Sequence, residues 1–369
     1  MTNARPLVFV VGTRAQLIKV APVLCACDAA GLSYELLLTG QHRETMVDLL
    51  EEFGVRQKPC ELLELRERAS ILALWLWLPR ALWATWNRFR ALRRQTGARP
   101  DAIVHGDTLS TLVGALAGWL AGARVVHLES GLTSRRLLDP FPEEFVRRLV
   151  FRFADIAFCP NAPAAELMRR RAHVKVIDTR ENTILDAVRI ALRRAGIRPT
   201  PVEPRYLVAS LHRFQNIYDR ERLGTLVEIL IRLAKDFRVV LVMHPATRSR
   251  LQVTGLLPRL TATAGLELSP RLPYTSFLTL AAQAHAVLTD GGSNQEELAF
   301  LGVPTVVMRP RTERPDGLGR NAILEPDLPC PVEAFIMSDK VETLRGHGQI
   351  GLAAQPSACI AAVLGGKGE

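Results

Sequence analysis

Short apolar runs recur along this chain, and a longer stretch with helical patterning follows each of them. Within the runs, Val, Ile and Leu follow one another instead of alternating with polar residues. Continuous hydrophobicity is typical of strands in parallel sheets whose two faces are covered by helices. The sequence therefore predicts an α/β chain with doubly wound parallel sheets. The predicted strands are residues 7–11, 34–38, 102–105, 124–128, 156–159, 174–177, 206–211, 238–243, 286–289 and 304–308.

The alternation of strand and helix patterns is interrupted once, and this interruption divides the chain. Residues 178–204 hold a helical pattern and then a Pro-rich stretch, where another strand would be due. Such stretches are typical of domain boundaries, and 369 residues are enough for two domains. We expect a first domain at 1–178, a second at 179–351, and a final helix within 352–366 that returns to the first.

The chain is basic, which bears on what it binds. Lys and Arg outnumber Asp and Glu by 47 to 37, and a net charge of +10 favours anionic ligands. The arginines are spread along the chain without a nucleic-acid-binding motif, so we expect no nucleic-acid partner. The cysteines show no CxxC pair or zinc-ligand spacing, so we expect reduced thiols and no metal. The N-terminus shows no signal-peptide pattern, so we expect a cytoplasmic protein.

One apolar segment, residues 69–86, is rich in tryptophan and followed by arginines. Pro79 and Arg80 interrupt it, and it falls short of the roughly 20 apolar residues that span a bilayer. We therefore expect that it does not cross a membrane. Two interpretations of residues 69–94 stay open: an interfacial helix in peripheral contact with a membrane, or, favoured, a helix packed in a domain interface or a homodimer interface.

Polar and glycine residues follow the predicted strands in both halves. Ligands of open parallel sheets bind outside the carboxyl ends of the strands, so these residues point to an enzyme with an interdomain cleft. The groups are Gly12-Thr13-Arg14, Gly40-Gln41-His42, Gly106-Asp107-Thr108, Glu129-Ser130-Gly131, His212-Arg213, His244-Pro245 and Asp290-Gly291-Gly292-Ser293.

Two of these loops suit anions. The loop 290–293 enters a helical pattern, and small residues there let backbone N–H groups approach a phosphate. A tight turn with Asp290 or Ser293 as helix cap explains it equally well. Glu297, one turn further on, faces either a ligand or solvent. Arg14 and Lys19 are either anion ligands or solvated cations.

The candidate acid–base groups have simpler explanations too. Asp107 can cap the helix that follows it. Glu129 ends a buried strand, where a carboxylate needs a partner or a function, and we favour function. His212 is either a phosphate-facing or acid–base group or a structural histidine.

The segment from Pro142 to Arg148 has the pattern of a helix start. Pro142 would lie in the first turn, and Glu143 and Glu144 near the positive end of the helix. The i,i+4 pairs Glu143/Arg147 and Glu144/Arg148 are then expected. This explanation alone accounts for the segment, and catalysis by Glu143 is the minority hypothesis at this point.

Taken together, the motifs resemble the bacterial non-hydrolysing UDP-N-acetylglucosamine 2-epimerases. They keep the family's order and cover most of residues 7–317. The resemblance implies the GT-B fold, which has two Rossmann-like domains and a nucleotide sugar between them. The matching stretches are VGTRAQLIKVAPV, LLTGQHRETM, VHGDTLSTLVGALA, VVHLESGLTS, PFPEEFVRRLVFRFADIAFCPN, LVASLHRFQN, VLTDGGSNQEELAFLGVPTVVMR and TERPDG.

The chemistry that the resemblance implies needs neither a metal nor a cofactor. A base removes the C2 proton of the sugar, and UDP leaves C1 to give a 2-acetamidoglucal intermediate. UDP then adds back as C2 is protonated on the other face, which gives UDP-N-acetylmannosamine for cell-surface polysaccharide biosynthesis. Two opposed acid–base groups are required.

The resemblance also implies roles for residues. The catalytic acid–base groups are Asp107, Glu129, Glu143 and His212. Arg14, Lys19 and Arg147 hold the diphosphate or the sugar, while Gly291, Gly292 and Ser293 face phosphate. Glu297 takes the ribose hydroxyls, and His244 and Arg314 complete the substrate-binding set. UDP is expected to bind mostly to the second domain.

The chain departs from the family pattern at several positions, although all four acid–base positions are present. The departures are Ala15-Gln16 for Pro-Glu, Phe214-Gln215 for Arg-Glu, Gly291-Gly292-Ser293 for Ser-Gly-Gly, Val146 for Asn, and the stretch after TERPDG. A related UDP-sugar therefore stays open as the substrate of the epimerase. Three other activities also stay open: a GT-B glycosyltransferase that uses a UDP-sugar, a hydrolysing 2-epimerase, and a non-catalytic nucleotide-sugar-binding protein.

Overall fold

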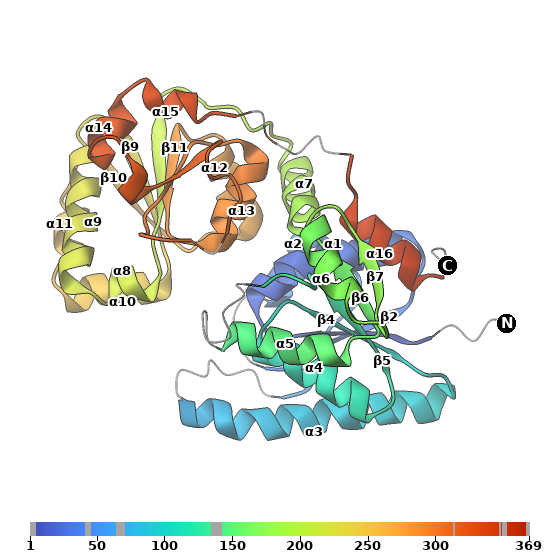
Figure 1. The fold of residues 1–369 in the computed structure, drawn as a ribbon. Helices are drawn as coiled ribbons and strands as arrows, with labels where there is room; N and C mark the ends of the chain where they lie inside the picture. Colours follow the sequence, from blue (N-terminus) through green and yellow to red (C-terminus); the bar gives the residue numbers. More distant parts are fainter. Residues whose placement is uncertain are drawn as a thin grey trace. The chain divides into compact units, whose positions relative to one another are not determined.

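The computed structural model describes residues 5–40, 46–63, 71–133, 142–312, 314–346, 348 and 353–366. The chain divides into two compact units, each with its own parallel sheet (Figure 1). The first unit is Met1–Ala187 with Ala353–Glu369, and the second is Val188–Leu352.

The first unit has a 7-stranded sheet in the order β3-β2-β1-β4-β5-β6-β7. All its pairs are parallel, and Val10 of β1 is in register with Leu37 of β2 and Val104 of β4. The strand order reverses direction between β1 and β4, so the switch point of this sheet lies there. The strands are β1 (Leu7–Val11), β2 (Tyr34–Leu38), β3 (Cys60–Glu61), β4 (Asp101–His105), β5 (Arg124–Leu128), β6 (Ile156–Cys159) and β7 (Lys175–Asp178).

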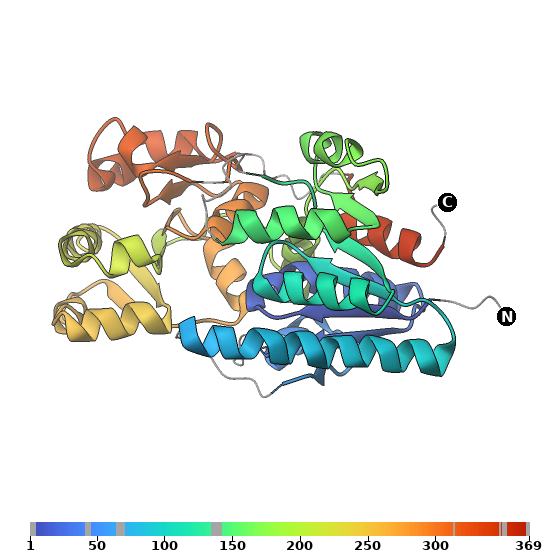
Figure 2. The same cartoon turned by 60° about the horizontal axis from the view of Figure 1, so that its bottom comes forward.

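Helices cover both faces of this sheet. Helices α3, α4 and α5 pack side by side on one face, and α1, α2 and α16 gather on the other (Figures 1 and 2). Capping boxes at Thr13 and Thr108 begin α1 and α4 immediately after β1 and β4. The helices are α1 (Arg14–Ala29), α2 (Met46–Phe53), α3 (Ile71–Thr96), α4 (Leu109–Leu120), α5 (Glu143–Phe153), α6 (Ala162–Arg169), α7 (Ile184–Ala195, which crosses the division) and α16 (Pro356–Leu364).

The second unit repeats the plan with a 6-stranded parallel sheet in the order β10-β9-β8-β11-β12-β13. Its switch point lies between β8 and β11. The strands are β8 (Tyr206–Ser210), β9 (Arg238–Met243), β10 (Leu266–Pro270), β11 (Ala286–Thr289), β12 (Thr305–Val307) and β13 (Ala322–Leu324). The helices are α8 (Phe214–Ile217), α9 (Arg220–Leu233), α10 (Pro245–Val253), α11 (Leu257–Thr261), α12 (Tyr274–Ala282), α13 (Gly292–Leu301), the 3-10 helix η1 (Glu325–Asp327), α14 (Val332–Met337) and α15 (Lys340–Thr343).

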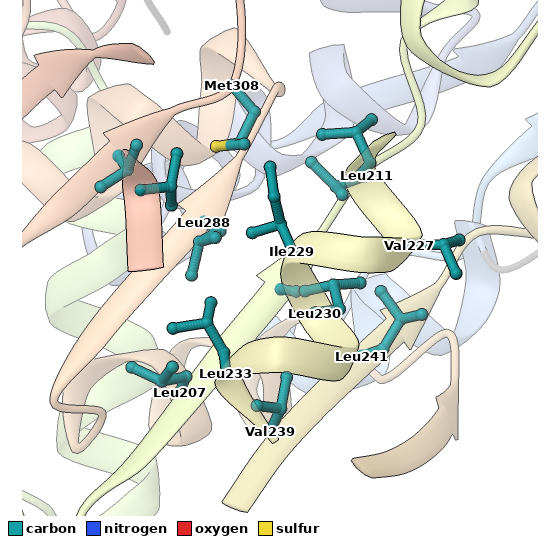
Figure 3. Packing of buried hydrophobic residues seen from close by; sticks show 14 of the residues in the cluster. Leu207, Leu211, Val227, Ile229, Leu230, Leu233, Val239, Leu241, Leu288 and Met308 are labelled. Atoms are coloured by element: carbon teal, nitrogen blue, oxygen red, sulfur yellow. The ribbon is translucent and has the colours of Figure 1, made fainter. Parts of the chain in front are cut away.

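The core of the second unit forms where α9 packs on the sheet. Leu230 and Leu233 of α9 are buried with Leu207 of β8 and Leu241 of β9 (Figure 3). Residues three apart on a helix share a face, so one stripe of α9 enters the core. This packing holds the carboxyl ends of β8 and β11 in place for the loops described below.

The doubly wound parallel fold predicted from the sequence is confirmed, and every predicted strand is present. Three strands were missed: β3, β10 and β13. Helix α3 continues through Pro79 as one 26-residue helix, so this proline interrupts the apolar run of the sequence without ending the helix. Within the described residues, no helix combines the length and apolar character that crossing a bilayer requires.

Candidate active site

At the switch point of the first sheet, Gln16 connects the loop after β1 to the end of β4. Its Oε1 accepts hydrogen bonds from the backbone N–H of Gly12 at 3.0 Å and Thr13 at 3.2 Å. Its Nε2 donates to the carbonyl of His105 at 2.7 Å and to Thr111 Oγ1 at 2.9 Å. The start of α1 is thereby tied to the end of β4, so Gln16, which departs from the family pattern, has a structural function here. The neighbouring Gln41-His42 lie outside the described residues.

Glu129, immediately after β5, is anchored on both sides. Its Oε1 accepts hydrogen bonds from Lys19 Nζ and Asn182 Nδ2, both at 2.6 Å, and its Oε2 lies 3.7 Å from His105 Nε2. Its backbone is left-handed, with φ of 57°. For a residue with a side chain this costs about 1–2 kcal/mol, and such strain concentrates at functional sites. The buried carboxylate therefore has partners and a strained position, as a functional group would.

Asp107 does not cap α4, because Thr108 is the N-cap. Asp107 instead forms an ion pair with Arg147 of α5. Arg147 also donates to Glu144 at 2.9 Å, and Arg148 donates to the same buried carboxylate at 2.9 Å. The expected Glu144/Arg148 pair is present. For Arg147 the expectation was wrong, since it pairs with Glu144 and Asp107 rather than with Glu143.

Glu143, the first residue of α5, differs from the other acids of this region. Its Oε2 is buried and has no hydrogen-bond partner among the described residues. A buried carboxylate oxygen without a partner is costly, so it signals either a function or a missing ligand. Among the three acids after β4, after β5 and at the start of α5, Glu143 is therefore the one with an unpartnered buried oxygen in the described part of the chain.

Sequence reasoning missed three residues of this network. Asn182 holds Glu129, His105 lies beside it, and the fully buried His127 contacts the Gly106 carbonyl at 2.8 Å through Nε2. Burial lowers the pKa of His127 to about 4, so the ring is neutral and its Nε2 donates. The signal for both histidines was their place in a buried strand, His105 at the end of β4 and His127 within β5. Asn182 had none, since it lies in an irregular segment.

In the second unit, Asp290 organises the loops at the switch point. This carboxylate is fully buried and accepts from the backbone N–H of His212 at 2.9 Å and of Arg213 at 3.0 Å. Asn216 Nδ2 donates to it at 2.8 Å. Asp290 thus does not cap α13, and its function is to fix the chain that follows β8 against the end of β11.

His212 is held over this loop. Its Nδ1 lies 3.4 Å from Asp290 Oδ1, and its ring centroid lies 5.7 Å from that of His244, the N-cap of α10. Burial lowers the pKa of His212 below the usual 6.5, while the Asp290 carboxylate raises it and nearby arginines lower it. The net direction is downward, so His212 is predominantly neutral at neutral pH.

The N-terminus of α13 has the form of an anion site. Its N-cap is Gly291, which has no side chain with which to cap the N–H groups of the first turn, and that turn includes Gly292 and Ser293. A Cβ added at Gly291 would lie 3.0 Å from His212 Cε1, so glycine lets the backbone approach the imidazole. Backbone N–H groups, the helix dipole and an imidazole together suit a phosphate.

Further along α13, the acidic and amide side chains of residues 295–297 are buried. Gln295 Nε2 donates to the carbonyls of Arg314 at 2.9 Å and Asp316 at 2.7 Å, which ties that segment to the helix. Arg314 lies 3.3 Å from the Glu296 carboxylate. Glu297 is only 2% exposed, so the solvent-facing alternative is excluded. Arg14 begins α1 in the first unit, where it is half-buried.

Comparisons with known proteins agree with this arrangement. The family model described as UDP-N-acetylglucosamine 2-epimerase matches residues 26–325. The UDP-N-acetylglucosamine 2-epimerase of Bacillus subtilis is 28% identical over 315 residues, which cover 84% of this chain and 80% of that protein. That of Methanococcus maripaludis is 31% identical over 236 residues, 61% of this chain and 64% of that protein.

Solved structures share the fold. The Neisseria meningitidis UDP-GlcNAc 2-epimerase bound to UDP-GlcNAc has a TM-score of 0.75 at 24% identity, over 97% of this chain and 99% of that one. Acinetobacter baumannii MurG has a TM-score of 0.56 at 12% identity, over 98% and 99% of the chains. These likenesses confirm the expected GT-B fold at the level of its two Rossmann-like units. Because the family model covers most of its length, the chain belongs to the UDP-N-acetylglucosamine 2-epimerase family.

Proposed function

We propose that this protein interconverts UDP-N-acetylglucosamine and UDP-N-acetylmannosamine by inverting C2. The observation that carries the proposal is the set of three carboxylates after β4, after β5 and at the start of α5, held in three different ways. Glu129 is bound by Lys19 and Asn182, whereas Asp107 is paired with Arg147. Glu143 keeps a buried oxygen without a partner in the described part of the chain. Proton transfer at two faces of one carbon requires acids in different states.

The steps follow from these environments. A carboxylate takes the C2 proton as the C1–O bond to UDP breaks, and the electron pair of the C–H bond forms the C1–C2 double bond. UDP then adds back to C1 as a second group protonates C2 on the opposite face. We assign one transfer to Glu143 because one of its oxygens has no hydrogen-bond partner among the described residues, and the other to Asp107 or Glu129.

The second unit supplies the features that suit UDP. The backbone N–H groups in the first turn of α13 and the His212 imidazole would bind the diphosphate. Glu297, buried in the same helix, would accept from the ribose hydroxyls, and Arg314 and His244 would complete this subsite. UDP must stay bound between the two half-reactions because it recombines, so these contacts contribute to catalysis as well as to affinity. Relatives solved with UDP-GlcNAc bound support this substrate class.

Solvent exchange at C2 tests the proposal. In heavy water, UDP-GlcNAc should gain deuterium at C2 and form UDP-ManNAc, with little free UDP, because the proton delivered is not the proton removed. Glu143→Gln should slow the exchange by about 100-fold or more, the usual contribution of an acid–base group. Glu166→Gln is a matched control on α6, since that carboxylate is 66% exposed, and it should keep the wild-type rate.

The other activities predict different products. A glycosyltransferase would leave C2 unlabelled and release UDP only with an acceptor, and a hydrolysing enzyme would release UDP and free sugar without one. Wild-type protein that binds UDP-GlcNAc but shows no C2 exchange would contradict the epimerase proposal.

A further inference from the structure

The outer face of α3 carries a stripe of apolar and basic side chains that the proposed reaction does not use. Leu76 and Trp83 are 53% and 66% exposed, and Arg80, Arg90 and Arg94 are exposed as well. The spacings from 76 to 80, 83, 90 and 94 are those of one face of a helix. The sequence of α3 contains arginines but no Asp or Glu. This face therefore combines apolar side chains with charged residues that are all cationic.

The opposite face of α3 is already occupied. Trp77 and Phe89 are fully buried, and Trp77 Nε1 donates to the Thr39 carbonyl at 2.8 Å. Arg88 is neutralised by Glu35 of β2, which accepts two hydrogen bonds from it at 2.9 and 2.6 Å. The helix is thus fixed on the first unit by its inner side, and packing within the unit does not explain the outer Leu76 and Trp83.

The carboxyl end of α4 continues this surface. Trp119 and Leu120 are 53% and 52% exposed, and the Trp119 ring lies 5.3 Å from that of Phe153. A hollow of about 610 Å³ lies between the two helices, lined by Trp86, Arg90, Arg93, Arg94, Trp119 and Leu120. Arg90 stacks over Trp86 at 4.7 Å. We call this surface of α3 and the end of α4 the Trp–Arg face (helix positions in Figure 2).

The Trp–Arg face is remote from the candidate catalytic groups of its unit. Helix α4 begins beside Asp107 and ends at Leu120, and its 12 residues span about 18 Å at 1.5 Å each. The hollow therefore lies at the amino ends of the strands, whereas the acids lie at their carboxyl ends. A ligand of the face is a different molecule from the UDP-sugar.

We propose that the Trp–Arg face docks on a membrane surface that contains anionic lipid. Indole rings partition to the boundary between headgroups and acyl chains, and arginines attract the phosphates of the same layer. Trp83, Trp119, Leu76 and Leu120 enter this boundary, while Arg80, Arg90 and Arg94 contact headgroups. We favour a membrane over a second copy of the chain, because the α3 helix of a second copy would supply no acid to pair with these arginines.

Vesicle co-sedimentation tests this docking. The protein should bind vesicles of phosphatidylcholine mixed with phosphatidylglycerol, bind pure phosphatidylcholine much less, and dissociate as salt is raised. The double variant Arg90→Glu/Arg94→Glu should lower the partition coefficient at least tenfold, and Trp83→Ala should lower it as well. Arg169→Glu is the control, since this arginine is 54% exposed on α6 and lies off the face. Exchange at C2 should stay unchanged in all of these variants.

Two results would overturn the docking proposal. One is an equal affinity of wild type and the double variant for anionic vesicles. The other is the failure of the wild type to bind anionic vesicles. A dimer, seen by analytical ultracentrifugation, that Trp83→Ala dissociates would then assign the face to a second copy. Neither result depends on the epimerase proposal, because both measurements are made without substrate.

Discussion

At the scale of single residues, the two units differ in the hydrogen-bond partners that they give to a buried acid. Asp290 accepts hydrogen bonds from backbone N–H groups and an amide, so its charge serves to build a loop. Glu143 has a buried oxygen without such a donor in the described residues. The first arrangement costs little and is rigid, and the second is costly unless a ligand uses it. Burial alone therefore does not distinguish these two acids, but their hydrogen-bond partners do.

Asp290→Asn should move the pH dependence of the reaction through His212. The Asp290 carboxylate raises the pKa of His212 against the larger effect of burial, so removal of this charge should lower that pKa further. If the neutral imidazole is the active form, the acid limb of kcat shifts to lower pH, and the rate also falls because an amide NH2 faces donors in the loop. Histidine NMR titration and the pH–rate profile measure the shift.

A matched variant distinguishes the effect of the Asp290 charge from the effect of disturbing the loop. Asn216→Ala removes one hydrogen bond to Asp290 but leaves the carboxylate in place. It should lower the rate without moving the acid limb. An acid limb that moves to higher pH in Asp290→Asn would contradict the electrostatic explanation.

At the scale of elements, the sequence predicted the interior of each sheet better than its edges. The missed strands β3, β10 and β13 are all edge strands. An edge strand has one neighbour and is often half-exposed, so it need not be continuously apolar; both residues of β3 are exposed. The predicted strands lie mostly inside the sheets, where burial on both faces imposes the hydrophobic run.

In the candidate site, the sequence predicted the residues that directly follow buried strands but not those in irregular segments. Residues directly after buried strands, such as Glu129 and His212, could be found because topology brings strand ends together. Asn182 could not, since only the folded chain brings it within 2.6 Å of Glu129. The partners of Arg147 were also beyond local patterns, because one of them, Asp107, lies 40 positions away in the chain.

Helix α4 offers a test of how closely it packs on the sheet. A Cβ added at Gly114 would lie 2.7 Å from Val104 Cγ1 and 2.9 Å from Val10 Cβ, so Gly114→Ala should destabilise the protein by about 1–3 kcal/mol through overpacking. Gly224, inside α9, has no atom within 4 Å of its added Cβ. Gly224→Ala should therefore stabilise by about 0.5–1 kcal/mol through helix propensity. Urea unfolding measures both, and an equal sign for the two variants would contradict the packing explanation.

At the scale of the whole molecule, the chain leaves the first unit after Ala187 and returns to it at Ala353. The returning segment forms α16, which packs on α1 (Figure 1). The backbone N–H of Ser357 donates to Asp186 Oδ2 at 2.9 Å, and Ile360 is 1% exposed. The second unit is thus inserted into the first, whose stability depends on residues from both ends of the chain.

Loss of the contact between α16 and α1 should destabilise the first unit selectively. Ile360→Ala removes a buried side chain, which costs about 2–5 kcal/mol, or roughly 4–20 °C in the midpoint of a unit of this size. Deletion of residues 353–369 should cost more, because all of α16 is lost. Tryptophan fluorescence reports the first unit, since all five tryptophans lie in it: Trp75, Trp77, Trp83, Trp86 and Trp119.

The control for this experiment is deletion of residues 367–369 alone, which keeps the sequence of α16 and should leave the fluorescence midpoint unchanged. Circular dichroism of the 353–369 deletion should still show helical structure that melts at higher temperature than the fluorescence transition, because the second unit keeps its own core. If the fluorescence midpoint of this deletion equals that of the wild type, α16 does not stabilise the first unit. In the 353–369 deletion, we expect the fluorescence midpoint to fall while the later dichroism transition keeps its midpoint. That result shows that α16 stabilises the first unit and not the second.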